Sequence, residues 1–103
     1  MKKRLEKVNN VAILAKRLIE KGAYVISNHA YERGKQRALS VGDIQNIIKT
    51  GYHEKIKDEY VEEFMDWNYA IKGKTLNSEL ARVCIAFVQE SSLIIVTVIR
   101  LEG

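Results

Sequence analysis

The sequence contains no proline and only one cysteine among its 103 residues. Because no proline marks a linker, and because the length suits one core, we expect a single domain over residues 1–103. One cysteine cannot form an internal disulfide, so the fold does not depend on an oxidising compartment. Cys84 lies in the apolar run RVCIAFV, which favours a small buried side chain over a nucleophile.

Long apolar runs are also missing from the chain. The N-terminal segment starts with basic residues, but its longest uninterrupted apolar run is VAILA, residues 11–15. This run is too short for a signal-peptide core or a membrane span, so we expect a cytoplasmic protein with no membrane partner. His29, His53 and Cys84 show no clustered ligand spacing, so we expect neither a metal nor a cofactor.

The residues that are present are typical of a folded, moderately basic domain. The apolar fraction is 47%, which is too high for a disordered chain. Charged residues make up 29%, and the formal net charge is +4. This excess favours association with polyanions but does not establish it.

Apolar spacing and capping residues predict three helices in the first half of the chain. Apolar residues at three- and four-residue spacing from Leu5 to Ile19 predict an amphipathic helix that ends before Gly22. The segment AYVIS, residues 23–27, can form a brief extended stretch before a second helix over residues 29–38, which Ser27 or Asn28 can cap.

A third helix is expected in the segment SVGDIQNIIKTG, residues 40–51. Ser40 followed three residues later by Asp43 is an N-terminal capping pattern, and Gly51 ends the helix. After Gly51 the apolar period changes from about four residues to two. The predicted strands are residues 53–59, 67–72, 80–89 and 93–101. Helices followed by strands imply an α+β fold, with the N-terminal helices on one face of a curved, four-stranded antiparallel sheet.

One predicted helix carries two stripes of different character. His29, Arg33 and Arg37 recur at every fourth residue, which is typical either of a solvated face or of a phosphate site. Small residues also recur at every fourth position, at Ala30, Gly34 and Ala38. We take the small stripe as the buried side, because it lets the helix backbone approach a neighbouring element closely.

Alternation along the strands separates an apolar face from a face with cations. The apolar face, which should pack against the helices, comprises Trp67, Tyr69, Ile71, Val83, Ile85 and Phe87. The opposite face carries small residues, with Lys72 and Arg82 near its rim. In the last strand Thr97 and Arg100 point opposite ways, so only one of them can join these two cations.

Histidine, arginine, lysine and threonine without a carboxylate pair suit metal-free RNA cleavage. A base removes the proton from a 2′-hydroxyl, an acid protonates the leaving oxygen, and cations stabilise the transition state. His29 near a helix N-terminus feels the positive end of the dipole, which favours the neutral form of a base. His53 is better explained as a structural residue, and we interpret Trp67 and Phe64 as core residues rather than base-stacking platforms.

The segment SNHAYERGKQRALSVGDIQNIIKTG resembles the S-x-H-A-x-x-R…R-x-[IL]-S-x-x-[DE] opening of a widespread small bacterial family catalogued as a domain of unknown function. The later segments YAIKGKT, ARVCIAFV and IIVTVIRL resemble the second block of that family. The resemblance covers residues 24–101 and leaves the N-terminal helix, residues 1–22, outside. The family is similar in pattern to the RelE- and BrnT-like toxin ribonucleases, which implies a RelE- or barnase-like fold.

The resemblance implies His29 and Arg33 as the leading site residues. In that wider group, scattered His, Arg, Lys, Thr or Tyr side chains carry catalysis. The candidate catalytic residues are therefore His29, Arg33, Arg82 and Thr97, and the candidate substrate-binding residues are Arg37, Lys72 and Arg100.

Three hypotheses follow from the sequence. The first is a metal-independent endoribonuclease of toxin type, which acts on RNA and requires a protein antitoxin that can cover the basic site. The N-terminal helix can take part in that contact or in a homodimer interface. The second is a non-catalytic module that binds RNA or an acidic protein through the same stripe. The third is a structural or dimerisation domain whose basic stripe is only solvated.

Overall fold

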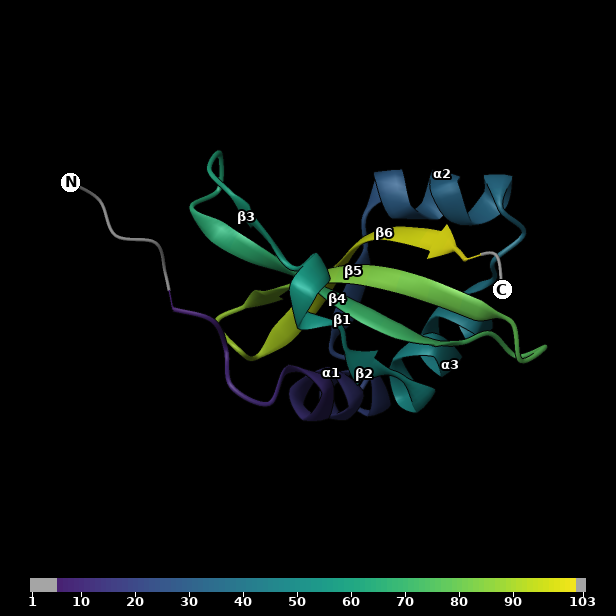
Figure 1. The fold of residues 1–103 in the computed structure, drawn as a ribbon, viewed down its shortest axis with the longest axis horizontal. Coiled ribbons are helices and arrows are strands. Elements are labelled where there is room, and N and C mark those ends of the chain that lie inside the picture. The colour runs from purple at the N-terminus through teal and green to yellow at the C-terminus, as the bar shows by residue number, and fades with distance from the viewer. Residues whose placement is uncertain (1–5, 102–103) are drawn as a thin grey trace.

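The computed structural model describes residues 6–101, which form three α-helices and a six-stranded sheet (Figure 1). The α+β class predicted from the sequence is confirmed. The helices are α1 (Val11–Glu20), α2 (Asn28–Gln36) and α3 (Val41–Thr50), with a 3₁₀ turn η1 (Lys55–Lys57). The strands are β1 (Tyr24–Ile26), β2 (Tyr52–His53), β3 (Glu59–Val61), β4 (Asp66–Lys74), β5 (Leu80–Val88) and β6 (Ser92–Arg100).

The prediction of four antiparallel strands is wrong in two places. The expected strand over residues 53–59 is divided into β2 and β3, with η1 between them, and both short strands pair with β4. The brief extended stretch before the second helix is β1, which joins the sheet by parallel pairing with β6. The strand order is β1-β6-β5-β4-β2, and β3 extends the β4 edge beyond β2.

The helix ends follow local capping chemistry. Ser27 Oγ accepts a hydrogen bond from the Ala30 N–H at 3.0 Å and caps α2. Ser40 and Asp43 form the full capping box at the start of α3. The first helix begins at Val11, so residues 6–10 are not helical, and the predicted start at Leu5 lies outside the described residues.

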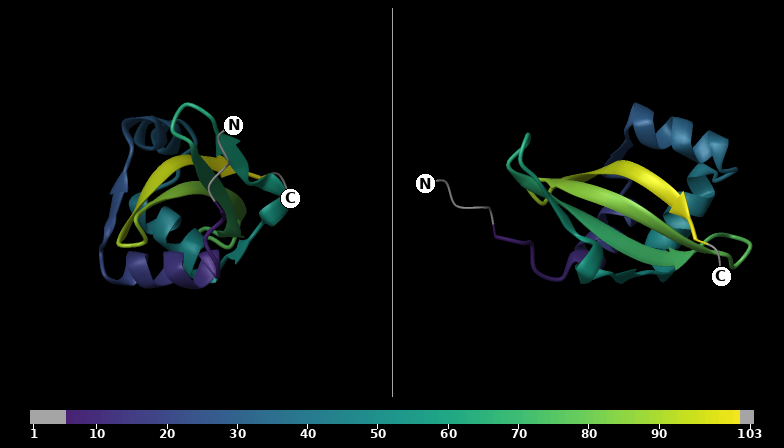
Figure 2. Two further views of the ribbon diagram at one scale, coloured as in Figure 1. Left: turned by 90° about the vertical axis from the view of Figure 1, so that its left-hand side faces the viewer. Right: turned by 45° about the horizontal axis from the view of Figure 1, so that its top comes forward.

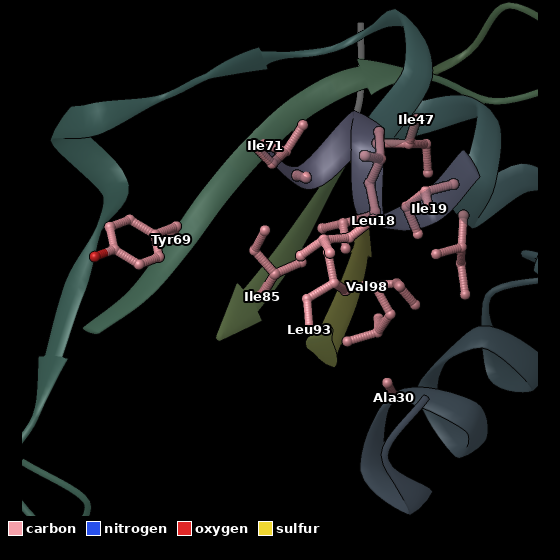
Figure 3. Packing of buried hydrophobic residues seen from close by; sticks show 14 of the residues in the cluster. Leu18, Ile19, Ala30, Ile47, Tyr69, Ile71, Ile85, Leu93 and Val98 are labelled. Carbon is pink, nitrogen blue, oxygen red and sulfur yellow. The ribbon is translucent and has the colours of Figure 1, made fainter. Parts of the chain in front are cut away.

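One face of the sheet is covered by α1 and α3. The core joins apolar residues of these two helices to the inward side chains of β4, β5 and β6; Figure 3 labels Leu18, Ile19, Ile47, Ile71, Ile85 and Val98 among them. The predicted division into faces is confirmed for β5, because Val83, Ile85 and Phe87 are buried while Arg82, Cys84 and Ala86 are half-buried. In β4 the outward-facing Ala70 is buried as well.

The second helix does not share the layer of the other two. In Figure 1, α1 and α3 lie below the sheet, whereas α2 lies above β6. Parallel pairing with β1 covers the outer edge of β6 from Leu93 to Ile95, and α2 follows along the rest of that strand. The predicted small-residue stripe is buried at Ala30 and Gly34, but Ala38 is exposed at φ 54°, because α2 has already ended at Gln36.

A β-bulge in the β5–β6 pair decides which polar residue of β6 faces outward. Cys84 pairs with Thr97 and Ile85 pairs with Ile95, which leaves Val96 unpaired between them. Without this extra residue Thr97 would share the buried face of Leu93 and Ile95. The bulge instead buries Val98 and turns Thr97 to the face opposite the helices.

Candidate functional site

The uncovered face of the sheet, called the open face below, brings three predicted site residues together. Lys72 of β4 pairs with Arg82 of β5, which in turn pairs with Ile99 of β6. In the next outward-facing row Cys84 pairs with Thr97. Side chains that oppose each other or lie diagonally across neighbouring strands are close enough to interact. Lys72, Arg82 and Thr97 therefore share one surface, and Arg100 lies on the other side of the sheet.

Arg82 is held in place by a carboxylate that no sequence pattern indicates. Its Nε donates to Glu54 Oε1 at 2.6 Å, and its Nη2 donates to Glu54 Oε2 at 3.2 Å. The hydrogen bond from Arg82 lowers the pKa of Glu54 and raises that of Arg82 in return. The pair fixes the orientation of the guanidinium but leaves Nη1 able to donate to a further acceptor.

The α2 helix presents its basic stripe beside the open face. Ala30 and Gly34 are buried, and Tyr31 and Lys35 line a cavity of about 210 Å³ that α3 residues also line. Helical geometry places His29 and Arg33 on the opposite flank of the buried stripe, away from α3. His29 is exposed, whereas Arg33 is half-buried and donates from Nη1 to Gln36 Oε1 at 3.1 Å.

Arg37 and Arg100 are engaged with the backbone where α2 meets β6. Arg37 Nη1 donates to the Val98 carbonyl, and Arg100 Nη2 donates to the carbonyls of Arg37 and Ala38 at 2.9 and 3.2 Å. Arg100 also forms an ion pair with Glu79 at 2.7 Å. These contacts satisfy carbonyls at the helix end and the strand edge, so both arginines hold α2 against the sheet.

Cys84 occupies the middle of the open face between Ala70 and Thr97. Burial raises the pKa of its thiol, which keeps the sulfur protonated and weakly nucleophilic. The geometry therefore favours the packing role inferred from its apolar surroundings.

An apolar cavity of about 420 Å³ opens on the same face, and we call it the open-face cavity. Its lining residues are Ser27, Val61, Phe64, Asp66, Asn68, Ala86, Phe87, Ile94 and Val96. Phe64, in the turn after β3, is 73% exposed, so its predicted place in the core is wrong. The cause is the β3–β4 hairpin, which extends beyond the end of the sheet opposite α3, as the right-hand view in Figure 2 shows. Trp67 is partly buried and does pack against the core.

A second polar cluster lies at the β4 edge. Asp58 is fully buried in its side chain and accepts from Lys7 Nζ at 2.9 Å, while His53 Nε2 lies 2.7 Å from the same oxygen. The other Asp58 oxygen accepts from the Ala70 N–H at 3.0 Å. Lys7 and His53 also line a neighbouring cavity of about 370 Å³. All three side chains contribute to closing the edge of the sheet.

The described residues offer no cluster suited to a metal ion. Within residues 6–101, no group of three or more His, Cys, Asp or Glu side chains converges on a common point. No helix in the same range has the length and apolar character needed to cross a membrane.

Fold and site together define a small α+β domain with a helix-covered sheet face and an uncovered face that carries cations and an apolar cavity. A family model described as a domain of unknown function (DUF4258) matches residues 26–100, and the chain belongs to this family. The resemblance inferred for residues 24–101 is confirmed to that extent, and α1 lies outside the matched range. No curated protein and no solved structure is detectably similar to the chain.

Proposed function

We propose that this domain is a metal-independent endoribonuclease of toxin type, which cleaves RNA phosphodiesters on the open face. The observation that carries the proposal is the shared surface of Lys72, Arg82 and Thr97, with the His29–Arg33 flank of α2 beside it. Two cations and a hydroxyl on an uncovered face match the need to bind a phosphate and stabilise its extra negative charge.

In the proposed reaction His29 accepts the proton of a 2′-hydroxyl, and the 2′-oxygen attacks the adjacent phosphorus. Arg33 and the Nη1 of Arg82 hold the phosphate oxygens, and Thr97 donates a hydrogen bond to them. The bond to the 5′-oxygen breaks, and the Lys72 ammonium supplies the proton that this oxygen needs, since arginine does not give up a proton in proteins. The products are a 2′,3′-cyclic phosphate and a free 5′-hydroxyl.

The proposal includes a relationship to the RelE- and BrnT-like toxin ribonucleases. Helices on one side of a central β4–β5–β6 meander are compatible with the RelE- and BrnT-like toxin ribonucleases that the sequence motif resembles. A cytoplasmic toxin of this kind needs a protein antitoxin, and the cations Lys72 and Arg82 of the open face offer contacts for an acidic partner. The proposal also keeps the homodimer that the sequence analysis considered for the N-terminal helix.

The second candidate function is a non-catalytic module that binds RNA or an acidic protein. It is favoured by the Glu54–Arg82 ion pair, because the Glu54 carboxylate neutralises the positive charge of Arg82. It is favoured also by the exposed position of His29, because water has free access to a base placed there.

Incubation of the purified domain with a labelled RNA in EDTA tests the proposal. We expect cleavage to cyclic-phosphate ends, and a loss of about 100-fold or more in rate for His29→Ala, because a positioned base contributes at least that factor. Lys49→Ala, an exposed lysine on α3, is the matched control and should cleave at the wild-type rate. Equal cleavage by His29→Ala would remove His29 from the mechanism, and salt-sensitive binding without cleavage would favour the binding module.

A further inference from the structure

The open-face cavity and the cations of the proposed site lie on the same surface in successive rows. The first outward-facing row is Lys72–Arg82–Ile99, and the second is Ala70–Cys84–Thr97. The third row contains Ala86 of β5 and Ile94 of β6, and Asn68 lies beside it in β4. Four residues along a strand correspond to about 13 Å. The long side chains of Lys72 and Arg82 shorten this gap across a middle row of short side chains, in which Ala70 is buried and Cys84 and Thr97 are half-buried.

The cavity has an apolar floor and an aromatic wall. Ala86, Ile94 and Val96 come from adjacent positions of β5 and β6, and Phe64 reaches the cavity from the turn after β3. Proteins stack the bases of single-stranded nucleic acids on exposed aromatic rings that adjoin a positively charged groove. Here the ring is Phe64, the one charged residue among those that line the cavity is Asp66, and the cations Lys72 and Arg82 lie two rows farther along the same face. The volume of about 420 Å³ lies within the range of small-molecule sites, about 300–1,000 Å³.

Polar groups at the rim are limited in number, which favours one orientation of a planar ligand. The Ser27 hydroxyl already donates to the Val96 carbonyl and accepts from Ala30, and Asp66 accepts from the Trp67 N–H. Asn68 lines the cavity with an amide that has both donors and an acceptor, which suits the edge of a base.

We propose that the open-face cavity holds an unstacked nucleobase of single-stranded RNA, stacked on Phe64, while the adjoining phosphate lies toward Lys72 and Arg82. This inference rests on the proposed function, because the same RNA strand would continue from the cavity to the cations. A purely apolar partner would have no use for the cationic row on this face, which is why we favour a nucleotide as the occupant.

Fluorescence anisotropy with an eight-nucleotide 2′-O-methyl RNA tests the proposal, because this probe binds without being cleaved. A second probe has the same backbone but abasic sites. We expect the wild type to bind the intact probe about tenfold more tightly than the abasic one, which corresponds to one stacked base. Phe64→Ala should lose this preference and bind both probes equally.

Two further variants separate the cavity from general effects on the fold. Ala86→Phe fills the cavity from its floor and should weaken binding of the intact probe about as much as Phe64→Ala. Leu76→Ala truncates another exposed apolar side chain, in the β4–β5 turn at the other end of the sheet, and should bind as the wild type does.

The outcomes distinguish the cavity from the catalytic proposal. Binding that depends on the base and on Phe64, without cleavage of ordinary RNA, supports the cavity assignment and contradicts the ribonuclease proposal. Cleavage that persists with unchanged binding in Phe64→Ala overturns the cavity assignment and leaves the ribonuclease standing. A Phe64→Ala effect on self-association alone would also overturn it, since the occupant would then be a second copy.

Discussion

The Asp58 carboxylate shows how one buried side chain can complete a sheet edge. Between β2 and β3 the edge of β4 lacks a strand partner, and Ala70 lies in this gap. Its carbonyl accepts from the Glu54 N–H at 2.8 Å, and its N–H donates to Asp58 Oδ1 at 3.0 Å. The η1 turn brings Asp58 into this position, where Lys7 Nζ balances its charge and His53 Nε2 lies within hydrogen-bond distance. A buried backbone N–H without such an acceptor would be costly.

Replacing Asp58 by alanine should therefore destabilise the fold strongly. The change leaves the Ala70 N–H without its acceptor and removes the counter-charge of Lys7. We therefore expect the free energy of unfolding to fall by about 3 kcal/mol. Asp58→Asn retains an acceptor oxygen and should cost less. Urea denaturation measures the free energy of unfolding of both variants. Glu32→Ala, which changes an exposed residue of α2, is the control and should lie within about 0.5 kcal/mol of the wild type. A loss for Asp58→Ala as small as that of the control would show that the carboxylate does not support the edge.

Local chemistry explains which residue roles could be predicted from the sequence. Ser27, Ser40 and Asp43 act on backbone groups within three residues, so their capping roles follow from spacing alone. Glu54 meets Arg82 across 28 residues, and Thr97 faces outward only because of a bulge in the strand pairing. Neither position leaves a periodic signal in the sequence.

Among the elements, α3 and β4 come into close backbone contact at Gly73. A Cβ atom at Gly73 would lie 2.0 Å from the Ile47 carbonyl oxygen and 2.9 Å from the Gly51 Cα. The end of α3 therefore rests directly on the β4 backbone. This close approach also sets the start of β2, which pairs with β4 immediately after Gly51.

Gly73→Ala should force these two elements apart. Because the clash is with backbone rather than with a flexible side chain, we expect a loss of at least about 3 kcal/mol in the free energy of unfolding, measured by thermal or urea denaturation. Gly42→Ala is the matched control, since its Cβ would meet side-chain atoms alone, the exposed Leu76 at 3.1 Å and Ser40 Oγ at 3.6 Å. It should be neutral or stabilise α3 by up to about 0.8 kcal/mol. Similar stabilities for the two variants would contradict the close approach.

The element pattern was predictable where a segment is long and regular. The helices α2 and α3 and the long strands β4, β5 and β6 follow from apolar periodicity and caps. The short strands β1, β2 and β3 have only two or three residues each, and their pairing is decided by tertiary contacts with β4 and β6. Periodicity cannot show that β1 runs parallel to β6, nor that α2 lies at the sheet edge rather than on its face.

For the whole molecule, the distribution of charge matters more than its total. The formal net charge of +4 is modest, and Arg37, Arg82 and Arg100 are engaged within the fold. RNA binding by this domain should therefore draw on few phosphate contacts together with the apolar cavity. Electrostatic and stacking contributions respond differently to salt, because only phosphate contacts release counterions from the nucleic acid.

The dependence of RNA affinity on salt separates these contributions. If Arg33, Lys72 and Arg82 each contact a phosphate, the logarithm of the affinity should fall with the logarithm of salt concentration with a slope of about −2. Lys72→Ala should make this slope shallower by about 0.7, because one phosphate contact is lost. Phe64→Ala should lower the affinity at every salt concentration and leave the slope unchanged, because stacking releases no counterions. Titrations of the 2′-O-methyl probe between 50 and 200 mM salt measure all three slopes, and an unchanged slope in Lys72→Ala would place the phosphates elsewhere.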